Sequence, residues 1–146
     1  MRTISAQLLM ASALGFAGFA APALAEDPVL QPLTIAKECS QYAGTLPSFC
    51  TITASNLAAI PVGTKAYYYG PVANNPNFSS NNVVLDDGAG NTAMGNCIVD
   101  FGAGPKGICA FYAGSGTLEG FMAVVHVTTS ADGLWHWDGG YLIDPR

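Results

Sequence analysis

The chain has 146 residues, of which half are hydrophobic and only a tenth are charged. This balance excludes an intrinsically disordered chain and predicts a large apolar interior or an apolar binding surface. Ten acidic residues against five basic ones give a formal net charge of −5. A surface of that sign repels phosphate backbones and anionic lipid head groups, so nucleic acid is not expected as a partner.

Residues 1–25 have the pattern of a secretory signal peptide. A positive tip at Met1-Arg2 precedes an apolar stretch over residues 8–20, and a small-residue Ala-Leu-Ala sequence ends at Ala25, just before acidic residues. We predict cleavage after Ala25, a secreted or periplasmic location, and no membrane insertion of the mature chain. The alternative is a membrane anchor, which the proline near the cut and the absence of a following basic segment disfavour.

The remaining chain is long enough for one compact domain. Residues 26–48 contain three prolines and show no sustained period, so we predict an irregular N-terminal arm with at most a short helical turn near residues 35–42. Over residues 49–146, short runs of β-branched and aromatic residues are separated by clusters of Gly, Asn, Asp and Pro. This pattern predicts a β domain over 49–146.

Glycine-rich turns divide this domain into strands. They recur at residues 88–90, 102–104 and 114–116, a spacing typical of an antiparallel meander. No amphipathic helix separates the strands, which argues against a parallel sheet. We predict an all-β fold, in which the meander closes into a single β-barrel of about eight strands, and a β-sandwich is the alternative. Seven strands are predicted at 49–56, 63–70, 82–86, 94–101, 107–113, 118–128 and 134–143, with an eighth in the arm or around Val72.

All four cysteines follow the predicted signal, and an even number in an exported chain predicts two disulfides. The gaps of 11, 47 and 12 residues between them do not match a zinc site, so no metal is expected. A turn at 102–104 places Cys97 directly opposite Cys109 in a hairpin, at a separation suited to a disulfide. This register favours Cys97–Cys109, and Cys39–Cys50 then follows by elimination.

Two histidines and an aspartate are the first candidate site. If Thr128 lies opposite Leu134 in the last hairpin, His126 faces His136, and Asp138 lies diagonal to His126 on the same face. Two imidazoles and a carboxylate are the groups that a divalent metal, a proton relay or a pH switch uses. The commoner role of such residues on an exposed strand face is a solvated polar stripe, and no metal or cofactor is predicted.

Alternating aromatic residues are the second candidate site. Three of them share the opposite face of the last strand, and others lie on neighbouring strands. Such residues usually form core, but in a barrel the same face can line a cavity for a small lipophilic ligand. The ligand-lining candidates are Tyr67, Tyr69, Phe121, Trp135, Trp137 and Tyr141. No nucleophile elbow, zinc-protease pair or phosphate-binding loop occurs, so catalytic residues are unassigned.

Three glycine-containing segments carry a family resemblance. They are Gly63-Thr64 with Gly70-Pro71-Val72, then Gly114-Ser115-Gly116-Thr117-Leu118-Glu119-Gly120-Phe121, and the closing Trp137-Asp138-Gly139-Gly140-Tyr141. With these segments, the stretch 49–143 resembles the barrel of allene oxide cyclases and dirigent proteins, particularly small exported bacterial members of no known activity. The resemblance implies an eight-stranded antiparallel barrel, often a homo-oligomer, whose apolar cavity holds a small hydrophobic molecule and steers its cyclisation or coupling by shape.

Three functions are compatible with these features, and the sequence favours a non-catalytic one. The first is binding of a small apolar ligand inside the barrel. The second is a cyclase-like or dirigent-like enzyme, which requires inward ionisable groups. The third is a structural or interaction module of the cell envelope. The groups available to the second are His126, His136, Asp138, Asp100 and Glu119.

Overall fold

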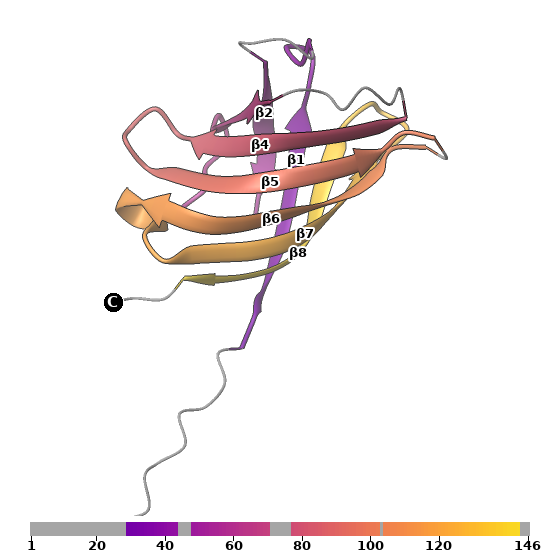
Figure 1. The fold of residues 1–146 in the computed structure, drawn as a ribbon. Helices are drawn as coiled ribbons and strands as arrows, with labels where there is room; N and C mark the ends of the chain where they lie inside the picture. Colours follow the sequence, from indigo (N-terminus) through magenta and orange to yellow (C-terminus); the bar gives the residue numbers. More distant parts are fainter. Residues whose placement is uncertain (1–28, 44–47, 71–76, 103, 144–146) are drawn as a thin grey trace, which may run out of the picture.

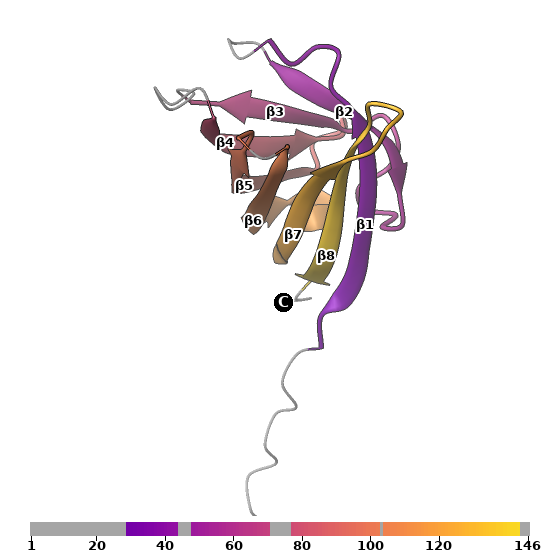
Figure 2. The same cartoon turned by 90° about the vertical axis from the view of Figure 1, so that its right-hand side faces the viewer.

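The structure, a computed structural model, describes residues 29–43, 48–70, 77–102 and 104–143. These residues form an all-β fold of eight antiparallel strands that close in chain order into one barrel, with β8 pairing back to β1. Figure 1 shows β4 to β8 as one curved wall, and Figure 2 shows β8 beside β1, where the barrel closes. The strands are β1 Gln31–Glu38, β2 Phe49–Ser55, β3 Lys65–Tyr69, β4 Phe78–Asp86, β5 Thr92–Asp100, β6 Lys106–Ser115, β7 Phe121–Thr129 and β8 Trp135–Ile143.

The predicted antiparallel barrel is therefore confirmed, and its eighth strand comes from the segment assigned to the arm. The seven predicted strands correspond to β2–β8, whereas β1 occupies residues 31–38. The prediction of a helical turn near 35–42 is wrong. Alternate residues of β1, namely Leu33, Ile35 and Lys37, are buried, as the two-residue period of a strand requires. Val72, the other place suggested for a strand, lies outside the described residues.

The hairpin of β5 and β6 has the predicted register, with Val99 opposite Gly107 and Cys97 opposite Cys109. The facing cysteines form a disulfide, and Cys39 and Cys50 form the second one between β2 and the segment that follows β1. Both predicted disulfides are confirmed. This pairing was predictable because few residues separate the end of β5 at Asp100 from the start of β6 at Lys106.

The predicted register of β7 and β8 is wrong by two residues. His126 lies opposite Asp138, and Thr128 lies opposite His136. The prediction paired Thr128 with Leu134, whereas β7 continues to Thr129, which lies opposite Trp135 at the start of β8. A backbone hydrogen bond of 3.0 Å from Ser130 to Leu134 then closes the loop. A shift of two residues keeps every side chain on its predicted face, so His126, His136 and Asp138 still share the outer face of the sheet.

One end of the barrel interior is filled by aromatic side chains. Phe121 of β7 lies 6.0 Å from Phe111 of β6 and 6.2 Å from Tyr141 of β8, measured between ring centroids. Phe111 also lies 5.3 Å from Trp137, edge to face. These contacts continue into buried aliphatic side chains such as Leu118. The aromatic alternation of β8 therefore forms core at this end.

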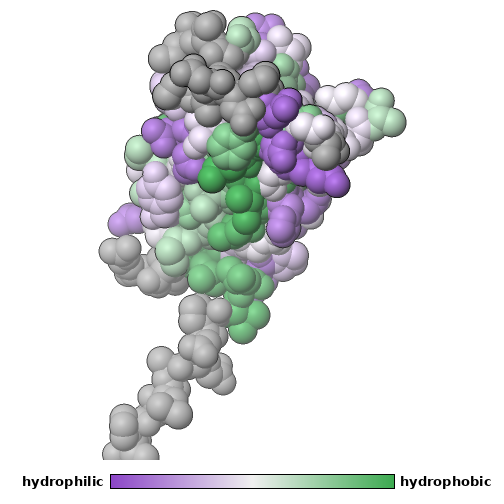
Figure 3. Space-filling view, turned by 45° about the vertical axis from the view of Figure 1, so that its right-hand side comes forward, coloured by the Kyte–Doolittle hydropathy of each residue, from purple (hydrophilic) through white to green (hydrophobic). Residues whose placement is uncertain are grey.

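The outer face of β5–β7 carries exposed apolar side chains. Figure 3 shows that hydrophobic side chains gather into a stripe on this face, with hydrophilic side chains on both sides. The exposed apolar residues of these three strands include Met94, Ile98, Ile108, Met122 and Val124. Within the described ranges, no helix is both long and apolar enough to span a membrane.

Candidate ligand-binding cavity

The other end of the barrel interior holds a cavity of about 240 Å³. It lies where the odd-numbered strands end and the even-numbered strands begin, so every strand contributes one or two residues to its wall. Its wall is formed by the aromatic residues Tyr42, Tyr68, Phe101, Trp135 and Trp137, the aliphatic residues Val99 and Val127, the polar residues Lys37, Ser79 and Asn81, and the four disulfide-bonded cysteines.

The cavity reaches the surface of the protein beside an aromatic pair. Phe101, which follows β5, lines the cavity and is 37% exposed. Its ring lies 6.2 Å from that of Trp135 at the start of β8, in an edge-to-face arrangement. A molecule that enters from solvent at this end would therefore first meet two aromatic side chains.

Lys37 is the charged side chain of the cavity wall. It is the third inward residue of β1 after Leu33 and Ile35, and only 3% of it is exposed. Its amine donates a hydrogen bond to the hydroxyl group of Tyr68 on β3. The same amine lies 3.8 Å from the ring centroid of Trp137, which reaches it because β8 pairs with β1. A phenol and an indole thus hold the amine in place.

The charge of Lys37 is not balanced by a carboxylate within the described part of the chain. Burial alone lowers the pKa of its amine well below the ordinary value of a lysine, with no contribution from a charged neighbour. The face of an aromatic ring stabilises a cation by about 0.5–2 kcal/mol, whereas burying an ion costs several kcal/mol. The folded protein therefore carries an unpaired basic group inside its barrel.

Tyr68 stays protonated in this environment. Burial raises the pKa of its phenol above the ordinary range, and the neighbouring Tyr42 adds to the rise. The two tyrosine rings meet edge to face at 5.2 Å between centroids. A protonated phenol can accept the hydrogen bond from Lys37 and also donate its own proton to another group.

The remaining polar groups of the wall offer hydrogen-bond donors. The side-chain amide of Asn81 donates to the Ser79 hydroxyl, so these two β4 residues partly satisfy each other. The indole N–H of Trp137 is buried and has no acceptor among the described residues. The donors that the wall can offer a ligand are therefore the amine of Lys37 and the hydroxyl group of Tyr68, while the side-chain oxygen of Asn81 is an acceptor.

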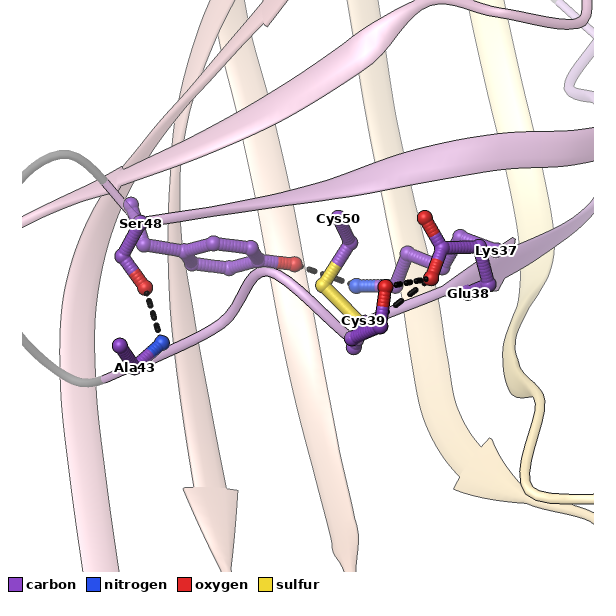
Figure 4. The surroundings of a disulfide bond; sticks show 8 residues. Lys37, Glu38, Cys39, Ala43, Ser48 and Cys50 are labelled. Atoms are coloured by element: carbon purple, nitrogen blue, oxygen red, sulfur yellow. Dashed lines mark hydrogen bonds between the residues drawn. A yellow bond between two sulfur atoms is a disulfide. The ribbon is translucent and has the colours of Figure 1, made fainter.

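Both disulfides lie at this end of the barrel. Cys39–Cys50 joins the segment after β1 to the start of β2, and Figure 4 shows it beside the Lys37 side chain. Cys97–Cys109 joins β5 to β6 on another part of the same wall. The two bridges fasten neighbouring strands around the cavity.

The structure separates the six predicted ligand-lining residues into three groups. Trp135 and Trp137 line the cavity. Phe121 and Tyr141 point into the barrel but belong to its filled end. Tyr67 and Tyr69 do not line the cavity, because the inward position of β3 belongs to Tyr68 and its two neighbours face outward.

The predicted polar constellation lies outside the cavity. His126 and Asp138 are exposed and face each other across β7 and β8, while His136 is half-buried and its Nε2 atom lies 2.8 Å from the Ser130 hydroxyl. Asp100 and Glu119 are also exposed. None of these five residues lines the cavity. Among the described residues, no group of three or more His, Cys, Asp or Glu side chains could hold a metal ion.

The sequence prediction missed the residues that define the chemistry of the cavity, above all Lys37 and Tyr68. A signal for Lys37 was present in the alternation Leu33, Ile35, Lys37, which places a lysine on the apolar face of a strand. It was missed because the prolines of residues 26–48 indicated an irregular arm. Tyr68 was one of three consecutive tyrosines, and only the pairing of β3 with β4 decides which of them faces inward.

No family model, no curated protein and no solved structure matches this chain.

Proposed function

We propose that this protein binds a small hydrophobic molecule in the cavity of its barrel. The observation that supports the proposal is a space of about 240 Å³ inside the barrel, with a mostly apolar wall that includes five aromatic side chains. Because the cavity reaches the surface, it exposes a mostly apolar wall to water, which costs free energy. A ligand that fills the space offsets this cost.

The cavity also contains a buried amine, which does not favour the stability of the fold. The buried Lys37 amine lacks a carboxylate partner within the described ranges, and an apolar residue of similar size would avoid its desolvation cost. Perturbed ionisable groups in a concave site are typical of binding and catalytic sites. We therefore favour a role for this end of the barrel over a purely structural role for the whole protein.

A cyclase-like or dirigent-like enzyme is the second candidate, and one observation favours it. Lys37 and Tyr68 form a hydrogen-bonded amine–phenol pair at the cavity wall, which can hold or move a proton. The five groups that the sequence offered for this purpose lie outside the cavity. Membership of the allene oxide cyclase or dirigent group stays a prediction, with which the closed eight-stranded barrel agrees.

We further propose that the protein acts after export, in a secreted or periplasmic form. Its two disulfides are compatible with an oxidising compartment. The predicted signal peptide at residues 1–25 lies outside the described residues.

The binding proposal can be tested with intrinsic fluorescence, because the protein has two tryptophans and both line the cavity. The mature, oxidised protein is titrated with a panel of one-ring and medium-chain apolar molecules. We expect a saturable change of tryptophan emission with at least one of them. Native mass spectrometry of the freshly purified protein should show a bound small molecule.

A cavity-filling variant provides the control. Val99→Phe places a ring in the cavity. Ile98→Phe changes the neighbouring residue and places the same ring on the outer face of the sheet. Binding should be lost in the first variant and kept in the second. Absence of saturable binding by every probe in the wild type, or equal binding in Val99→Phe, would contradict the proposal.

A further inference from the structure

We infer that the cavity selects molecules that carry a carboxylate on a small apolar body, with the carboxylate seated against Lys37. The inference rests on the proposed function, because it specifies the chemical class of the ligand that the same cavity takes. It goes further in predicting discrimination between an acid and a neutral molecule of the same shape.

Lys37 and Tyr68 present hydrogen-bond donors in the wall of the cavity. A lysine ammonium group has three protons to donate, and Tyr68 accepts one of them. The Tyr68 hydroxyl keeps its own proton to donate, and the Asn81 amide already donates to Ser79. A carboxylate is an acceptor-only group with two oxygens, so it complements such a wall better than an alcohol or an amine does.

The charge of the cavity wall also favours a carboxylate ligand. The titratable side chains that line the cavity with Lys37 are Tyr42 and Tyr68, since all four cysteines of the wall are in disulfides. No carboxylate of the described residues lines it. A ligand carboxylate would supply the opposite charge that the protein leaves out. In a mostly apolar wall, such a pair is stronger than at the surface because water screens it less.

The volume of the cavity limits the size of the ligand. An engineered protein cavity of about 150 Å³ takes a benzene molecule, whereas drug-sized ligands occupy about 300–1,000 Å³. The present cavity of about 240 Å³ lies between these values. Together with its aromatic wall, this volume fits a one-ring aromatic acid with a short side chain better than a long-chain lipid.

Proton uptake is a direct consequence. Desolvation lowers the pKa of the Lys37 amine in the free protein, and a bound carboxylate would raise it again by favouring the protonated form. Above the lowered pKa, binding of an acid would therefore take up a proton from solvent. Binding of a neutral molecule would leave the proton count unchanged.

The test compares 3-phenylpropanoate with 3-phenylpropan-1-ol, which differ only in the carboxylate. Affinities are measured by tryptophan fluorescence and calorimetry for the wild type, Lys37→Met and Lys65→Met. Lys65 is the matched control, because it is an exposed lysine over the ring of Phe49 and lies outside the cavity. In the wild type and in Lys65→Met we expect the acid to bind about tenfold or more tightly than the alcohol.

In Lys37→Met this preference should disappear, so that the affinities for acid and alcohol lie within about threefold of each other, a difference below 1 kcal/mol. Equal affinities for acid and alcohol in the wild type would overturn the inference and leave the binding proposal intact. An undiminished preference for the acid in Lys37→Met would also overturn it. Absence of binding by either compound and by all other probes would instead contradict the proposed function.

A measurement on the wild type alone covers the case in which Lys37→Met does not fold. Calorimetry of the acid in two buffers with different ionisation enthalpies, repeated between pH 7 and pH 9, should show proton uptake for the acid and none for the alcohol. If the acid binds and no proton is taken up at any pH in this range, the carboxylate does not bind against Lys37.

Discussion

Lys37 occupies a position that the alternation of β1 would otherwise give to an apolar side chain. Its methylene groups continue the buried row of Leu33 and Ile35, and its amine ends between Tyr68 and Trp137. Because a buried amine is more stable in its neutral form, the folded protein binds the lysine proton less tightly than the unfolded chain does. The stability of the protein is therefore linked to pH through this one residue.

The sign of this linkage can be predicted. The folded pKa of Lys37 is lowered and the unfolded pKa is about 10.4, so between these values the unfolded chain holds more protons. The free energy of unfolding should then rise with pH in that window, by at most about 1.4 kcal/mol per pH unit, and fall on acidification. We expect Lys37→Met to remove this slope in urea-unfolding series between pH 7 and about pH 9.5, before tyrosines ionise.

Lys65→Met is the control for this experiment, because Lys65 is exposed and its removal should leave the slope unchanged. A wild-type slope that persists in Lys37→Met would show that another group causes it.

At the scale of the element, β8 combines two large inward residues with a glycine between them. Trp137 and Tyr141 point into the barrel, and Gly139 lies midway between them along the strand. A Cβ atom at Gly139 would lie 2.1 Å from the carbonyl oxygen of Val124 on β7, a distance that real contacts do not reach. The close pairing of β7 and β8, and with it the position of Trp137, depends on this missing side chain.

Gly139→Ala should therefore destabilise the barrel by about 1–3 kcal/mol, because the backbone of β7 has to move away. The neighbouring Gly140→Ala is the matched control. Its Cβ would lie 3.2 Å from the Cβ atom of Leu30, so Leu30, which precedes β1, has to move by only a few tenths of an ångström. Urea-unfolding midpoints of the two variants should differ in this direction, and equal midpoints would contradict the packing argument.

At the scale of the whole molecule, the two disulfides fasten the same end of the barrel. Cys39–Cys50 and Cys97–Cys109 both line the cavity, whereas the opposite end is held by packed side chains. The end that contains the cavity has less packing to hold it, because side-chain contacts across the barrel are missing there. Covalent links between neighbouring strands compensate for this lack.

Removal of one bridge should therefore have a large effect on the whole domain. We expect Cys97→Ala/Cys109→Ala to lower the free energy of unfolding by about 2–4 kcal/mol under oxidising conditions. A reductant should lower the free energy of unfolding more in the wild type than in this variant, because the variant has only Cys39–Cys50 left to break. Equal losses, or an unchanged unfolding midpoint in the oxidised variant, would contradict this role.

Local patterns of the sequence were sufficient for much of the fold. Glycine-rich turns and two-residue alternation predicted the strands β2–β8, and the short turn at 102–104 fixed the partner of Cys97. They also placed Trp135 and Trp137 on the inner face of β8. In each case the residues that decide the structure are close together in the chain, so that turn chemistry and strand period are enough.

The cavity itself was decided by the tertiary structure. Lys37 meets Trp137 only because β1 pairs with β8, and it meets Tyr68 only across the barrel from β3. No local period encodes a contact between residues so far apart in the chain, and the prolines of residues 26–48 concealed β1. Local patterns in the sequence were enough to predict an all-β barrel with two disulfides. Closure of that barrel decided which side chains surround the cavity, because closure alone brings the first and last strands together.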